Sequence, residues 1–161
     1  MNLLLRALRL ITIVTWVGGL IFFAFVEAPT AFHVMGTTQQ FAQLINGSIT
    51  TLNRVGQTCG LVFFIATIPV WLRTDTQRRK LLRAELLLVL LMMAATDYVQ
   101  SSIIPAMERD RIAAGGAIDT FDQTSPTTAH FNKLHHSSEL LEEAILLLGL
   151  ATVVLVAWAE S

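Results

Sequence analysis

The stretch HFNKLHHSSELLEEAILLLGLATVVLVAWA, residues 130–159, decides the fold. Its first part gathers histidines and glutamates, and the part from residue 144 onward has no charged side chain. A membrane helix needs about 20 mainly apolar residues to cross a hydrocarbon core roughly 30 Å thick. Residues 140–159 reach that length, so the stretch predicts a membrane-spanning helix that carries ionisable side chains on the turns preceding its apolar part.

Three further apolar stretches predict spans over residues 10–28, 55–72 and 86–104. The composition agrees, because 53% of the residues are hydrophobic and only 14% are charged. We therefore expect an all-α, integral membrane four-helix bundle that forms one domain over residues 1–161. The expected location is the cell membrane, which in a bacterium is the inner membrane. A net charge of -1 offers no basic surface for nucleic acid.

Basic residues predict the orientation of the bundle, since short cytoplasmic loops hold an excess of Lys and Arg. The segment RTDTQRRKLLR, residues 73–83, is the densest basic stretch, and Arg6 and Arg9 add to the N-terminal end. Residues 27–53 contain neither Lys nor Arg. Both termini should therefore be cytoplasmic, and residues 29–53 and 105–133 should form loops that face outward.

The two outward loops contain helix signals of their own. Phe41, Leu44 and Ile45 recur at helical spacing after Thr37 and Thr38, which predicts a short helix along the surface of the first loop. In the second loop, Ser125 followed by Pro126 resembles a helix N-cap with proline at the first helical position. The fourth helix should therefore begin near residue 126, well outside the bilayer.

Polar residues gather in the outward halves of the spans, whereas the inward halves contain little that is ionisable beyond Glu85. A charge inside a bilayer usually faces a bundle interior or a wet cavity. Asp97, roughly 10 Å inside the outer boundary, is the clearest case. The alternative is that Arg54 neutralises Asp97 or Glu27 and locks the helices. The residues predicted to line an outward-facing ligand pocket are Glu27, Arg54, Gln57, Asp97, Gln100 and Ser138.

The start of the fourth helix offers candidate metal ligands. His135 and Glu139 share a helix face, and a histidine beside a carboxylate can bind a metal ion or relay protons. His33 and His130 complete the predicted ligand set, although acids at a helix N-terminus also favour its dipole. Glu142 and Glu143 are expected only to reach the interface. The cofactor stays open between a metal ion and haem, and haem is disfavoured because no histidine lies inside the first three spans.

Three segments resemble a known family. They are WVGGLIFFAFVEAPTAF at residues 16–32, IIPAMERDR at residues 103–111 and HFNKLHHSS at residues 130–138. Together they are similar to the bacterial domain of unknown function related to eukaryotic transmembrane protein 205. The positions that carry the pattern are Trp16, Gly18, Gly19, Pro29, Pro105, Met107, Phe131, His135 and Ser138.

The resemblance implies a four-helix membrane protein. The eukaryotic relative is associated with resistance to platinum drugs, which suggests transport or the handling of soft metals. His136, Glu142 and Glu143 are less obviously part of the family pattern. A weaker likeness connects the opening helix to the copper-resistance D family and to the membrane protoporphyrinogen oxidases.

Three functions remain open from the sequence. The first is a protein that binds or transports a cation, soft metals included, or a small polar ligand in the outward pocket. The second is a redox protein linked to haem or quinone. The third is an accessory subunit of a larger membrane complex or a homo-oligomer. Whether the protein is an enzyme stays open, with the balance against it. A hydrolase is disfavoured, because Ser137 and Ser138 beside His135 lie on one helix and lack the converging geometry of a catalytic triad.

Overall fold

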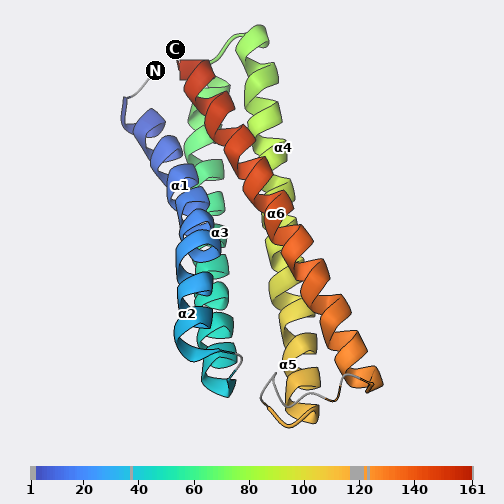
Figure 1. Cartoon of the computed structure of the whole chain (residues 1–161). Helices are drawn as coiled ribbons and strands as arrows, with labels where there is room; N and C mark the ends of the chain where they lie inside the picture. The colour runs from blue at the N-terminus through green and yellow to red at the C-terminus, as the bar shows by residue number, and fades with distance from the viewer. Residues whose placement is uncertain (1–2, 37, 117–121, 123, 161) are drawn as a thin grey trace.

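The computed structural model describes residues 3–36, 38–116, 122 and 124–160. Its elements are α1 (Leu3–Phe22), the π-helix η1 (Phe23–Glu27), α2 (Ala28–Met35), α3 (Gln39–Leu72), α4 (Thr76–Tyr98), the π-helix η2 (Val99–Ile103), α5 (Ile104–Ala113) and α6 (Pro126–Glu160). Several of these elements join end to end, so the chain forms four long helical segments (Figure 1).

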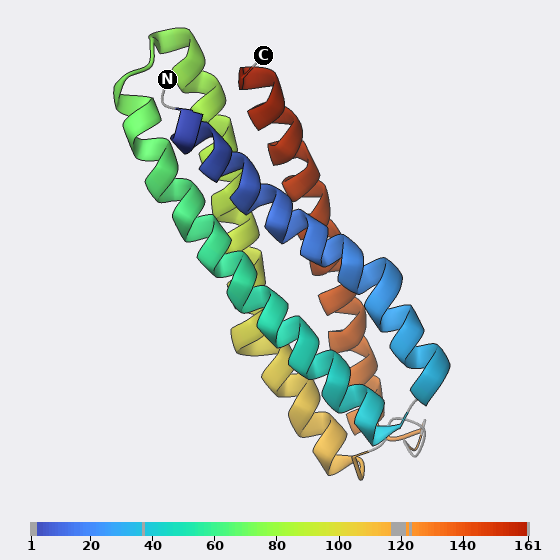
Figure 2. The same cartoon turned by 90° about the vertical axis from the view of Figure 1, so that its left-hand side faces the viewer.

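The four segments pack as an up-and-down bundle. Helix α1 packs against α3 and α6, and α4 packs against the same two helices. Both chain ends lie at the same end of the bundle as the α3–α4 connection (Figures 1 and 2). Each segment is long and apolar enough to cross a membrane. The all-α four-helix bundle is thus confirmed, and it is that of a multi-pass membrane protein.

The first and third helical segments continue past the ends of the predicted apolar spans, toward the end of the bundle away from the chain ends (Figure 1). The first segment continues through η1 to Met35, and the third continues through η2 to Ala113. Pro29 and Pro105 each follow a π-helix closely. A proline removes one backbone donor and crowds the carbonyl four residues earlier, and the wider π turn accommodates this without ending the helix. Residues 29–35 and 105–113 are therefore helical, where the sequence predicted loops.

The expected surface helix in the first outward loop is replaced by the first turns of α3. Thr38 caps this helix by accepting a hydrogen bond from the backbone N–H of Phe41 at 3.2 Å. No proline interrupts the chain between this cap and the second span, so one helix runs through both. Thr37, the other predicted cap, lies outside the described residues. At the second outward connection, Ser125 accepts from Thr127 at 3.2 Å, and α6 begins at Pro126.

The core lies in the middle of the bundle and in the part nearer the chain ends. It surrounds Trp16, which is 1% exposed. The indole fits against α3 because Gly56 and Gly60 have no side chain there: a Cβ at Gly56 would overlap the Trp16 ring. A Cβ at Gly149 would similarly lie 2.5 Å from Val17. The Gly56–Gly60 pair thus lets α1 approach α3 closely.

Candidate functional site

Two polar contacts join α3 to α4 and to η2 in the half of the bundle that lies away from the chain ends (Figure 1). The side-chain amide of Asn53 donates to Gln100 Oε1 at 3.3 Å, and Gln57 donates to the backbone carbonyl of Met93 at 2.8 Å. Asn53 is buried, whereas Gln57 and Gln100 are half-buried. These contacts bring two of the residues predicted from the sequence, Gln57 and Gln100, to the same seam between helices.

Arg54 and Asp97 lie at the edge of this seam. Because α3 and α4 are antiparallel, the Asn53–Gln100 and Gln57–Met93 contacts bring Arg54 and Asp97 to about the same level. Both side chains are exposed. Within the described residues neither forms an ion pair, so the expected neutralisation of Asp97 by Arg54 is not made in this conformation.

The predicted residues of the first segment lie apart from the seam. Glu27 ends η1 and is half-buried, and His33 is exposed on α2. Neither side chain has an ion pair among the residues that the structure describes.

The outer turns of α6 hold the histidines on exposed surfaces. His130 Nδ1 lies 2.7 Å from Asp110 Oδ2, and His135 Nε2 lies 3.3 Å from Glu139 Oε1. The ring of His135 stacks on Phe131 with 6.1 Å between centroids. Across the described part of the chain, no group of three or more His, Cys, Asp or Glu side chains could hold a metal ion.

Glu142 differs from the other acids of α6, because both of its carboxylate oxygens are buried and have no hydrogen-bond partner in the described structure. It follows Ser138 by four residues and precedes Ile145 by three, so the three share one face of α6. Ile145 is fully buried, and Ser138 is half-buried with its hydroxyl donating to the carbonyl of His135 at 2.7 Å. The helix face that Glu142 shares with Ile145 therefore turns its side chain into the bundle.

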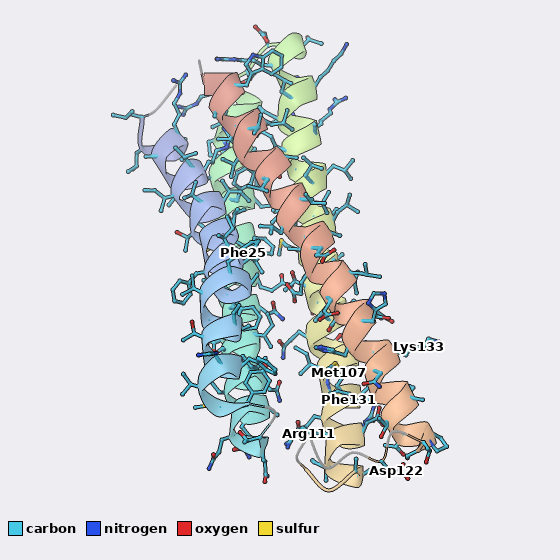
Figure 3. All side chains as sticks on the ribbon, in the orientation of Figure 1. Phe25, Met107, Arg111, Asp122, Phe131 and Lys133 are labelled. Carbon is cyan, nitrogen blue, oxygen red and sulfur yellow. The ribbon has the colours of Figure 1, made fainter. Side chains whose placement is uncertain are left out.

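Two contacts set the level of Glu142 relative to α4 and η2. A Cβ at Gly149 would lie 3.1 Å from Met92, and His130 pairs with Asp110 further out. Between these points the two antiparallel helices have the same rise per residue. Glu142 therefore lies at the same height along the bundle as Val99, one residue from the height of Gln100. In this half of the bundle, Figure 3 shows oxygen and nitrogen atoms of side chains between the pair of segments with α1 and α3 and the pair with α4 and α6.

Thr96 on α4 carries a second buried polar atom without a hydrogen-bond partner in the described structure. It lies about one helical turn from the level of Glu142, toward the end of the bundle that holds the chain ends. Its side chain is 1% exposed, and its hydroxyl oxygen is buried without a hydrogen-bond partner in the part of the chain described. By the same register, Thr96 lies level with Ile145, one turn from Glu142 on α6. A buried polar atom that lacks a partner in a native structure calls for an explanation, such as an ion or a water molecule.

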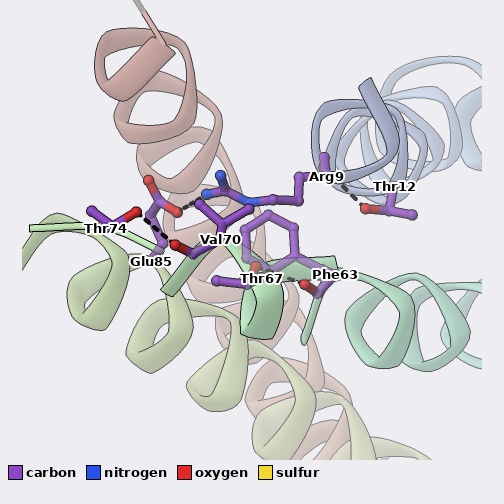
Figure 4. A network of polar contacts seen from close by, with 7 residues as sticks. All are labelled: Arg9, Thr12, Phe63, Thr67, Val70, Thr74 and Glu85. Atoms are coloured by element: carbon purple, nitrogen blue, oxygen red, sulfur yellow. Dashed lines mark hydrogen bonds and ion pairs between the residues drawn. The ribbon is translucent and has the colours of Figure 1, made fainter. Parts of the chain in front are cut away.

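The half of the bundle nearer the chain ends contains a buried ion pair. Arg9 reaches from α1 to Glu85 on α4, and its guanidinium lies 5.3 Å from the centroid of the Phe63 ring on α3 (Figure 4). Arg9 is 1% exposed and Glu85 0%. From the sequence, Arg9 indicates only the orientation of the bundle, and Glu85 is only an ionisable exception among apolar residues. Both are instead partners within the core.

Sequence reasoning missed Glu142, Thr96 and the Arg9–Glu85 pair. For Glu142 a signal was present, because residues 131, 138, 142, 145 and 149 repeat at intervals of three, four and seven, as a core-facing helix stripe does. For Arg9 and Glu85, 76 positions apart, no local pattern indicates contact.

Comparison with known proteins places part of the chain in a family. Residues 11–111 match the domain of unknown function DUF4149, which covers more than half of the chain. The matched region includes the Asn53–Gln100 seam, whereas α6 with Glu142 lies beyond it. No curated protein and no solved structure gives a match. The chain therefore belongs to the family of the domain of unknown function DUF4149.

Proposed function

We propose that this membrane protein binds a small monovalent cation in the outward half of its bundle, with the Glu142 carboxylate as the charged ligand. The observation that carries the proposal is the burial of both Glu142 oxygens without a hydrogen-bond partner among the described residues. An isolated buried carboxylate is very costly unless it is neutralised. The group therefore holds either a proton or a cation.

The charge and chemistry of the surroundings favour a hard monovalent ion. One carboxylate cancels one positive charge, whereas a divalent ion would leave a buried net charge. The polar groups at nearby levels of the bundle offer oxygen ligands: the amides of the Asn53–Gln100 pair close to the level of Glu142, and the Thr96 hydroxyl one turn away. Oxygen ligands suit hard cations such as sodium and potassium, and soft metals prefer sulfur.

The remaining residues singled out in the sequence enter the proposal as an outer approach to this site. Ser138 and His135 lie on successive turns of α6 outside Glu142 and would line the path. The acids Glu27 and Glu139 would raise the local cation concentration around the outer rim. We also propose that His33 and His130 belong to this rim, that the exposed Arg54 and Asp97 lie at about the level of the site, and that Gln57 supports the α3–α4 seam.

The orientation and the wider relationship are part of the same proposal. We infer that both termini and the basic α3–α4 connection are cytoplasmic, as the excess of Lys and Arg indicates. The cation site would then open toward the outside. A relationship to eukaryotic transmembrane protein 205 rests on the three motif segments, of which the first two lie within the matched region.

Sodium chloride or potassium chloride is expected to raise the unfolding midpoint of the purified full-length protein in nanodiscs. Choline chloride at the same ionic strength is expected not to do so. A ligand at a hundredfold excess over its dissociation constant stabilises the folded state by about 2.7 kcal/mol. Glu142→Gln should abolish the difference between the salts, because the amide carries no charge to balance the ion.

Glu143→Gln is the matched control, since Glu143 is the adjacent residue and its side chain is exposed. It should respond to sodium or potassium as the unsubstituted protein does. A protein whose midpoint is the same in all three salts would contradict the proposal. So would an unchanged salt response in Glu142→Gln.

The haem alternative gains no support from the fold, because all four histidines are exposed rather than buried between helices. A buried axial ligand is what a haem protein of this size requires. An absorption spectrum of protein purified from haem-replete cells tests this alternative directly.

A further inference from the structure

A cleft of about 300 Å³ lies at the opposite end of the bundle from the cation site, where α3 passes into α4. Its walls include Arg73 and Arg78 together with the apolar residues Leu5, Pro69 and Val70. The cleft therefore combines positive charge with an apolar floor at the boundary of the membrane-crossing helices.

The positive charge of Arg73 is available to a ligand. Arg73 is exposed, and its side chain has no hydrogen bond or ion pair among the described residues. The one acid in the wall, Asp75, caps α4 by accepting from the backbone N–H of Arg78 at 3.1 Å. The Thr74 hydroxyl donates to the Val70 carbonyl at 2.6 Å, so the guanidinium groups are the strongest anion-binding groups of the cleft.

The surface beside the cleft is apolar. Leu72 is 72% exposed, Leu4 70% and Ile68 55%. In a bilayer these side chains face acyl chains, while arginines at the level of the headgroups meet lipid phosphates. An arginine fork also binds phosphate oxygens in a bidentate manner.

We propose that this cleft binds the phosphate group of an anionic phospholipid, with Arg73 as the principal contact and Leu72 and Ile68 against the acyl chains. The lipid would join the ends of α1, α3 and α4 in the inner leaflet. The inference is independent of the cation site, which lies in the other half of the bundle.

Phosphatidylglycerol is expected to bind the full-length protein in mild detergent more tightly than phosphatidylcholine, as measured by native mass spectrometry during lipid titration. Arg73→Gln should weaken phosphatidylglycerol binding about fivefold, the effect expected for one basic residue near an anionic lipid surface. Arg73→Lys, which keeps the charge, should lose less.

Lys80→Gln is the matched control, because Lys80 is an exposed basic residue of the same segment that does not line the cleft. It should leave the affinity unchanged. Equal losses in Arg73→Gln and Lys80→Gln would overturn the proposal in favour of diffuse attraction. Equal binding of phosphatidylcholine would also overturn it. Inorganic phosphate that displaced the lipid at similar concentration would show that the cleft binds a free anion instead.

Discussion

Replacing Arg9 with methionine is expected to lower the free energy of unfolding by about 3–5 kcal/mol, because the buried Glu85 carboxylate would lose its ion pair with Arg9. The two side chains are almost fully buried, and α1 and α4 meet through their contact. The substitution also removes the guanidinium from the Phe63 ring. Reversible unfolding of the purified protein in mixed micelles measures the change.

A double-mutant cycle separates the ion pair from the general loss of a large side chain. Glu85→Leu combined with Arg9→Met should recover most of the lost stability, since replacing both partners of a buried pair by apolar groups is often neutral. Arg109→Met, at an exposed arginine of α5, should change the stability by less than about 0.5 kcal/mol. If Arg9→Met were as mild as Arg109→Met, the pair would not stabilise the bundle.

Trp16→Ala is expected to destabilise the bundle by about 3–5 kcal/mol, the usual cost of removing a large aromatic side chain from a core. The indole is 1% exposed and fills the space that Gly56 and Gly60 leave free. Because this contact holds α1 against α3, the loss should also broaden the unfolding transition. The same unfolding assay gives the magnitude.

Gly56→Ala tests the same contact from the other helix. An added Cβ would overlap the Trp16 ring and should cost about 1–3 kcal/mol, as overpacking does. The cost should fall sharply when Trp16 is already alanine. Gly18→Ala is the control, since Gly18 has no atom within 4 Å of an added Cβ, and it should be neutral or stabilising. Additive effects of Gly56→Ala and Trp16→Ala would contradict the packing described here.

The existence of four apolar helices could be predicted because hydrophobicity over about 20 residues is a local property of the sequence. Helix ends were predicted less well. Pro29 and Pro105 suggested that helices end there, yet η1 and η2 absorb the prolines and the helices continue. Such π turns depend on how neighbouring segments pack, which a single-sequence pattern does not contain.

The candidate site, too, could be predicted only in part. Gln57 and Gln100 were predicted and do lie at one seam, because their spans had to be antiparallel neighbours. The side chains of Asp97 and Arg54 are exposed instead, since a rotation of one residue changes a helical direction by about 100°. The same rotation per residue explains why Glu142 faces the interior of the bundle, whereas the next residue, Glu143, is exposed.

Proton release on cation binding tests the central claim most directly. In the proposed account the empty site holds Glu142 as the neutral acid, so a bound cation displaces its proton. Adding sodium or potassium chloride to the protein in weak buffer at neutral pH should release about one proton per bound cation, and choline chloride should release none. Glu143→Gln should behave in the same way, whereas Glu142→Gln should release no proton. The absence of any release from the unsubstituted protein, or equal release from Glu142→Gln, would contradict the account.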